Sequence, residues 1–249
     1  MRGSLLAVTE TGAGPAVLLV HGQPGSRADW LGLVPLLADR HRVLSVDRPG
    51  YGTTGGEAIG LVDNAELLGQ LLVDRSAVGA TVVGHSLGAG IALAMAERSL
   101  GAGALVLIGA AGVDGTVGAL DRVLALPFAS TLGISGVRRL VRALGCHAAG
   151  PVGLAIDGWG PTSGHAFTRE QRSLLRERTV LEDGLGAITV PTTVVVGGRD
   201  RVVSPAAQRA LAGRIQGARL IELPRAGHLI PHHEPERLAE IVRTVSRSL

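Results

Sequence analysis

Short apolar runs alternate along the chain with longer segments in which apolar residues recur at helical spacing. Runs such as 16–20 and 104–108 are almost wholly apolar, which is typical of strands buried on both faces of a parallel sheet. Strands are predicted at 5–11, 16–20, 42–46, 81–83, 104–108, 192–196 and 219–223. Helices are predicted at 30–37, 62–75, 89–98, 205–215 and 235–248. The alternation predicts an α/β fold with a mostly parallel sheet flanked by helices.

Two of the predicted helices begin at residues that commonly cap helices. Asp63 or Asn64 is expected to cap the helix that starts near residue 62. Ser204 is expected to cap the helix predicted at 205–215. Pro205 stands in its first position, where no backbone N–H is needed.

The alternation of strands and helices stops between residues 108 and 192. This stretch contains helical patterns at 117–126, 137–144 and 168–181, separated by glycine and proline. A segment so long without a strand is better interpreted as an inserted helical cap than as a loop. Three parts are therefore predicted: a first part of the core at 1–113, a helical cap at 114–189 and a second part of the core at 190–249.

Composition narrows the class of protein. The chain has 249 residues, of which 46% are hydrophobic and 18% charged, as expected for a globular protein. The net charge is only +3, and the arginines that supply every positive side chain are dispersed, so we expect no nucleic-acid partner. The single Cys146 excludes an internal disulfide and fits a reducing compartment. We expect a cytoplasmic protein without a membrane partner; association into a homodimer is left open.

The segment from Gly84 to Gly88 carries the strongest chemical signal. A buried strand runs directly into a helix through Gly-His-Ser-Leu-Gly, which places Ser86 on a tight turn. Small residues are needed two positions before and after such a serine, because larger side chains would collide. The turn lifts the hydroxyl above the edge of the sheet, at the start of the helix, where Ser86 is a candidate nucleophile.

A nucleophilic serine needs a base and an acid that orients the base. Asp200 follows the 192–196 strand, and His228 follows the 219–223 strand. The carboxyl ends of parallel strands share one edge of a sheet, so both side chains are expected near Ser86. Asp114, which follows the 104–108 strand, remains an alternative acid. His85 is interpreted as a packing residue beneath the turn.

The loop after the 16–20 strand is a candidate for half of an oxyanion hole. Its residues are His21-Gly22-Gln23-Pro24-Gly25. The backbone N–H groups of Gln23 and Leu87 are expected to meet across the substrate oxygen, and the Gln23 side chain is a second candidate for substrate contact. No spacing of ligand residues suggests a metal site, and no glycine-rich loop matches a phosphate cradle. We therefore expect neither a metal nor a cofactor.

These motifs together resemble the α/β-hydrolase superfamily, in particular its capped small-molecule serine hydrolases. The resemblance rests on 21–25, 47–52, 84–88, 197–200 and 227–228, in that order, and covers the chain outside the predicted cap. It implies an eight-stranded sheet, a triad of Ser86, Asp200 and His228, and no cofactor. The Asp47–Gly52 segment resembles the structural turn beside the pocket and is assigned no chemistry.

The function predicted from these residues is hydrolysis of a small, apolar carboxylic ester, lactone or thioester. Phe128, Trp159 and Phe167 of the predicted cap are candidates for substrate contact, although they could equally anchor the cap to the core. A carbon–carbon bond hydrolase with the same triad is an alternative; Leu229 stands where some such relatives carry tryptophan. A ligand receptor and a cofactor-free lyase or oxygenase on the same fold are further alternatives.

Overall fold

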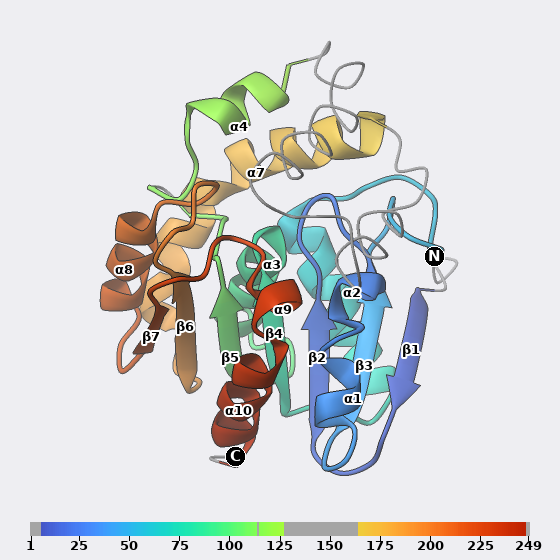
Figure 1. The fold of residues 1–249 in the computed structure, drawn as a ribbon. Helices are drawn as coiled ribbons and strands as arrows, with labels where there is room; N and C mark the ends of the chain where they lie inside the picture. Colours follow the sequence, from blue (N-terminus) through green and yellow to red (C-terminus); the bar gives the residue numbers. More distant parts are fainter. Residues whose placement is uncertain (1–5, 114, 127–163, 248–249) are drawn as a thin grey trace.

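The computed structural model describes residues 6–113, 115–126 and 164–247, and within them it has a seven-stranded sheet in the order β1-β3-β2-β4-β5-β6-β7 (Figure 1). β1 is antiparallel to β3, and every other neighbouring pair is parallel. The strands are β1 (Ala7–Thr11), β2 (Ala16–Val20), β3 (Arg42–Asp47), β4 (Ala80–His85), β5 (Ala102–Ile108), β6 (Thr192–Gly197) and β7 (Arg219–Leu223). Each coincides with a predicted apolar run, which confirms the predicted α/β class. The eighth strand came from the resemblance alone and is not among the described residues.

Helices cover both faces of the sheet. In Figure 1, α1 and α10 lie in front of the sheet, and α2 and α3 lie behind it. The helical elements are η1 (Arg27–Trp30), α1 (Val34–Leu37), α2 (Leu61–Asp74), α3 (Leu87–Glu97), α4 (Ala119–Leu124), α7 (Gly164–Gly184), η2 (Leu185–Ala187), α8 (Pro205–Arg214), α9 (Ile230–His233) and α10 (Pro235–Ser246). Side chains of β2 alternate between two apolar clusters: Leu18 and Val20 pack with α2 and α3, whereas Val17 and Leu19 pack with α1 and α10.

The predicted caps of α2 were wrong. The helix begins after Gly60, and neither Asp63 nor Asn64 caps it. Instead, the carboxylate of Glu177, on α7, accepts hydrogen bonds from the backbone N–H groups of Leu61 (2.8 Å) and Val62 (3.1 Å). A carboxylate at this end is favoured by the helix dipole and satisfies two otherwise unpaired donors. The capping group comes from a distant part of the sequence, so local pattern did not reveal it.

The start of α8 was predicted more closely. Ser204 occupies the position before the helix and Pro205 is its first residue, as expected. The Ser204 side chain, however, makes no capping hydrogen bond. Proline at the first position therefore accounts for the start of this helix without a contribution from the serine hydroxyl.

Two helices of the inserted segment, α4 and α7, lie beyond the carboxyl ends of the parallel strands (Figure 1). They correspond to the predicted helical patterns at 117–126 and 168–181. The third pattern, at 137–144, lies outside the described residues, as do Phe128, Trp159, Asp114 and Cys146. The limits of the cap at 114 and 189 stay a prediction. Among the helices that the structure describes, none is long and apolar enough to cross a bilayer.

Glu97, the last residue of α3, makes the stability of the fold depend on pH. Burial raises the pKa of this carboxyl from 4.5 to about 7, although a hydrogen bond from Arg98 (3.0 Å) acts in the opposite direction. The unfolded chain therefore releases the proton at lower pH than the folded chain. The free energy of unfolding should fall as pH rises from about 4.5 to about 7.

We predict that Glu97→Gln removes this dependence, because a neutral amide has no proton to lose. At pH 8 the variant should be more stable than the wild type by roughly 2 kcal/mol, and at pH 4.5 the two should be similar. Urea unfolding at both pH values measures the difference, with the exposed Glu66→Gln on α2 as control. An equal effect of Glu97→Gln at both pH values would contradict the raised pKa.

Candidate active site

Ser86 occupies a strained turn between β4 and α3. Its backbone has φ 53° and ψ −119°, a conformation that residues with a side chain rarely adopt. Three backbone hydrogen bonds hold it there. The Ser86 N–H donates to Ile108 O (2.8 Å), and the Ser86 carbonyl accepts from the N–H groups of Ala89 (3.0 Å) and Ala111 (3.1 Å). The sharp turn of the chain at this residue is therefore fixed from both sides.

The two glycines that flank the turn leave no room for side chains, as the sequence predicts. A Cβ on Gly84 would lie 2.3 Å from the carbonyl oxygen of Gly88, and a Cβ on Gly88 would lie 2.2 Å from that of Val20. Backbone atoms cannot move aside as a flexible side chain can. The close approach of β2, β4 and α3 at this point therefore requires glycine at both positions.

Asp200 and His228 lie together at the same edge of the sheet. His228 Nδ1 is 2.8 Å from Asp200 Oδ2, and the other carboxylate oxygen accepts from the N–H groups of Val202 (2.8 Å) and Val203 (2.9 Å). Burial alone would raise the pKa of Asp200, but the hydrogen bond and charge of His228 and the two backbone donors outweigh it, so the pKa lies below its ordinary value. The ionised carboxylate holds the proton on Nδ1 and leaves Nε2 free to accept one.

His85 links the turn that carries Ser86 to the loop after β7 that carries His228. Its Nε2 lies 3.0 Å from the backbone carbonyl of His228, and the two rings are 4.9 Å apart between centroids. Burial and the nearby charge of His228 lower the pKa of His85 to about 3, so the ring is neutral and its N–H donates to that carbonyl. The residue next to Ser86 thus bonds directly to His228, which fits the packing role predicted for His85.

The loop after β2 approaches the serine turn closely. A Cβ on Gly22 would lie only 3.0 Å from Cβ of Ser86. Leu87 is the first residue of α3, so its N–H has no acceptor within the helix. The Gln23 side chain donates to the backbone carbonyl of Phe167 on α7 (2.8 Å), which engages it with the inserted segment rather than leaving it free for a substrate. The structure thus brings Ser86, Leu87 and the Gln23 loop together.

Comparison with known proteins places this arrangement in a family. The sequence profile described as the alpha/beta hydrolase family matches residues 17–241. The chain belongs to this family. An uncharacterized protein of Mycobacterium tuberculosis is 30% identical over 275 residues, which cover 97% of this chain and 78% of that protein.

One further relative and one solved structure carry names that describe an activity. The pimeloyl-[acyl-carrier protein] methyl ester esterase of Aeromonas hydrophila is 27% identical over 261 residues, covering 95% of this chain and 97% of that protein. The structure of an esterase from Exiguobacterium antarcticum superimposes with a TM-score of 0.85 at 22% identity, covering 97% of this chain and 95% of that chain. At 22% identity, the superposition with the Exiguobacterium antarcticum structure shows only that the two chains share a fold.

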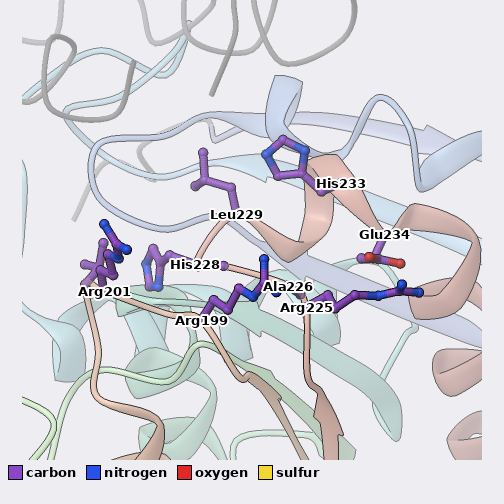
Figure 2. Close-up of a pocket in the computed structure, with 10 residues that line it drawn as sticks. Arg199, Arg201, Arg225, Ala226, His228, Leu229, His233 and Glu234 are labelled. Carbon is purple, nitrogen blue, oxygen red and sulfur yellow. The ribbon is translucent and has the colours of Figure 1, made fainter. Parts of the chain in front are cut away.

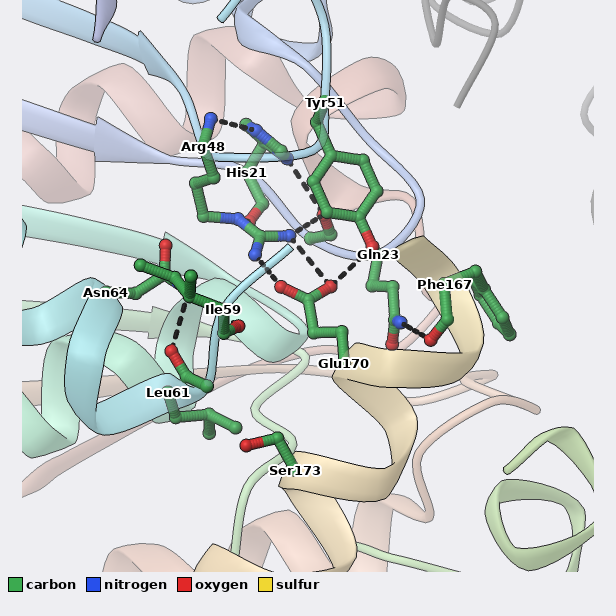
Figure 3. A network of polar contacts seen from close by, with 12 residues as sticks. His21, Gln23, Arg48, Tyr51, Ile59, Leu61, Asn64, Phe167, Glu170 and Ser173 are labelled. Atoms are coloured by element: carbon green, nitrogen blue, oxygen red, sulfur yellow. Dashed lines mark hydrogen bonds and ion pairs between the residues drawn. The ribbon is translucent and has the colours of Figure 1, made fainter. Parts of the chain in front are cut away.

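A buried ion pair joins the core of this hydrolase to its inserted segment. Arg48, directly after β3, pairs with Glu170 on α7, and both side chains are fully buried (Figure 3). The hydroxyl of Tyr51 also donates to the Glu170 carboxylate (2.6 Å). The Arg48 guanidinium lies 4.7 Å from the centre of the Tyr51 ring, within reach of a cation–π interaction. The charge of each partner is thus compensated within the protein.

The same arginine holds the loop that carries Gln23. Its guanidinium donates to the carbonyl oxygens of Gly22 (2.7 Å) and His21 (3.2 Å), and its backbone N–H donates to Nε2 of His21 (3.0 Å). Burial and the charge of Arg48 hold the pKa of His21 well below its ordinary value, so its ring is neutral, with Nδ1 donating to Gly22 O (2.8 Å). Arg48 therefore fixes both the loop that carries Gln23 and the helix α7.

Sequence reasoning missed this network. The Asp47–Gly52 segment was assigned no chemistry, and Glu170 was not singled out. The only signal was an arginine directly after a buried strand, where a charge requires compensation. Its partner lies on α7, and no local pattern links the two positions. Phe167, a predicted substrate contact, is buried on α7; that role stays a prediction.

We predict that Glu170→Ala destabilises the protein by about 3–5 kcal/mol, because it leaves the Arg48 charge buried and unpaired. The double variant Arg48→Met with Glu170→Leu should lose much less, since it removes both charges. Urea unfolding of both variants checks this difference. A double variant as unstable as Glu170→Ala would show that the contacts of Arg48 with the Gly22 loop, rather than an uncompensated charge, dominate.

Within the part of the chain that the structure describes, no group of three or more His, Cys, Asp or Glu side chains is arranged to hold a metal ion.

Proposed function

We propose that this chain is a serine hydrolase that cleaves a small carboxylic ester, lactone or thioester through an acyl-enzyme on Ser86. One observation carries the proposal. A serine held in a strained conformation between a strand and a helix lies at the sheet edge where His228 is hydrogen-bonded to a buried aspartate. This combination provides a nucleophile, a base and a group that orients the base.

The reaction follows from these positions. Nε2 of His228 takes the hydroxyl proton as Ser86 Oγ attacks the carbonyl carbon, and Asp200 stabilises the imidazolium that forms. The backbone N–H groups of Gln23 and Leu87 bind the oxyanion. His228 then returns the proton to the leaving alcohol or thiol, which departs and leaves the acyl group on Ser86. Water, deprotonated by His228, attacks this acyl group, and His228 returns the proton to Ser86 Oγ as the acid is released.

One relative supports an ester substrate. The name of the Aeromonas hydrophila protein describes an esterase that acts on a methyl ester. In our proposal the apolar part of the substrate faces the cap near Phe167. Thioesters and lactones would use the same attack and the same oxyanion donors, so they remain within the proposed class.

We predict that a fluorophosphonate probe labels Ser86, as detected by mass spectrometry of the intact chain and its peptides. Ser86→Ala should abolish labelling and lower kcat for p-nitrophenyl butyrate by about 10⁴–10⁶-fold. Asp200→Asn should lower kcat by about 10⁴-fold, because the imidazole would hold the wrong tautomer. Ser204→Ala, which removes an exposed hydroxyl without a capping hydrogen bond, is the matched control and should retain labelling and turnover.

Other outcomes would favour the alternatives. Labelling of Ser86 without ester turnover, but with cleavage of a vinylogous diketone, would favour a carbon–carbon bond hydrolase with the same residues. Tight ligand binding with negligible turnover would favour a receptor. Activity retained in Ser86→Ala would overturn the acyl-enzyme and favour a lyase or oxygenase that uses His228 alone.

A further inference from the structure

A cavity of about 500 Å³ lies beside His228 (Figure 2). Its wall includes His228 and three arginines, Arg199, Arg201 and Arg225. Sites for small molecules commonly enclose about 300–1,000 Å³, so this cavity is large enough to hold part of a substrate. A molecule that occupies it touches the histidine that serves as base in the proposed reaction.

The three arginines reach the cavity from two loops that also position Asp200 and His228. Arg199 and Arg201 directly flank Asp200, and Arg225 precedes His228 by three residues on the loop after β7. The backbone N–H of Arg199 donates to the carbonyl of Ala226 (2.9 Å), which holds the two loops together. Figure 2 shows Arg199 and Arg201 nearest to the ring of His228 and Arg225 farther along the same wall.

These arginines differ from other exposed arginines in the described parts of the chain, many of which have acidic partners. Arg209, for example, pairs with Glu222 at 2.7 Å. No ion pair or side-chain hydrogen bond with a described residue engages Arg199, Arg201 or Arg225. Glu234 is the single carboxylate of the cavity wall, so the wall has a net formal charge of +2 when its histidines are neutral.

We propose that this cavity binds an anionic group of the substrate, a carboxylate or a phosphate, while the ester of the same molecule is attacked by Ser86. The proposal rests on the proposed hydrolase function and adds a charged end to the substrate class. Guanidinium groups match both anions because they donate two parallel hydrogen bonds to a pair of oxygens. The three guanidinium groups, which have no partner among the described side chains, and the excess positive charge beside His228 distinguish this wall from an apolar pocket.

Three p-nitrophenyl esters of matched length test the proposal: the pentanoate, which is neutral, the glutarate monoester, which ends in a carboxylate, and the 4-phosphonobutyrate, which ends in a phosphonate. The wild type should hydrolyse at least one anionic ester with kcat/KM about tenfold above that of the pentanoate. The preference should fall as salt rises, because ions screen an exposed charge. Whichever anionic ester is preferred identifies the anion.

Variants test whether the cavity arginines cause the preference for anionic esters. Arg199→Gln and Arg201→Gln should each lower the ratio of anionic to neutral kcat/KM by about tenfold, mainly through KM, and Arg201→Glu should lower it further. Arg237→Gln, which removes an exposed arginine on α10 outside the cavity, should leave the ratio unchanged. Pentanoate hydrolysis without preference for either anionic ester would overturn this inference and leave the hydrolase intact. Absence of hydrolysis of all three esters, with no labelling of Ser86, would instead overturn the proposed function.

Discussion

The left-handed backbone of Ser86 is the constraint to which the surrounding structure is adapted. A residue with a side chain can occupy this conformation only when its neighbours hold it there, and here they are the end of β5, the first turn of α3 and the segment at Ala111. The backbone around this residue is crowded, because β2, β4 and α3 meet so closely that Gly84 and Gly88 have no space for a Cβ. At the same place the loop after β2 comes into close contact with the serine turn at Gly22, and His85, beside the serine, bonds to the backbone of His228.

A second set of contacts fixes the position of α7, in the inserted segment, against the core. Arg48 and Glu170 form a fully buried ion pair, and Glu177, two turns farther along α7, caps α2. A buried ion pair contributes little net stability compared with apolar packing, but breaking one partner is costly. The ion pair between Arg48 and Glu170 therefore acts mainly by fixing the positions of the segments that it joins. The position of α7 and the conformation of the loop that carries Gln23 depend on the same guanidinium.

Much of this architecture could be predicted from the sequence, because strand burial and turn chemistry are local properties. Apolar runs located every described strand, and the positions of Asp200 and His228 at strand ends indicated that these two side chains would meet. Contacts between distant segments that no motif or strand end marks were not predictable. Local reasoning chose Asp63 or Asn64 as the cap of α2, whereas Glu177 fills that place, and arginines that looked dispersed along the chain gather around one cavity.

The tie between Arg48 and Glu170 also limits how this scaffold can be recombined. A chimera that takes α7 from a relative without an acid at position 170 would leave Arg48 buried without a compensating charge and loosen the loop beside Ser86. For a library aimed at new substrates, positions 170 and 177 therefore belong with the core and should stay fixed. Sequence variation is better directed at α4 and at the cavity wall that includes Arg199, Arg201 and Arg225, where no buried charge depends on the residue that is changed.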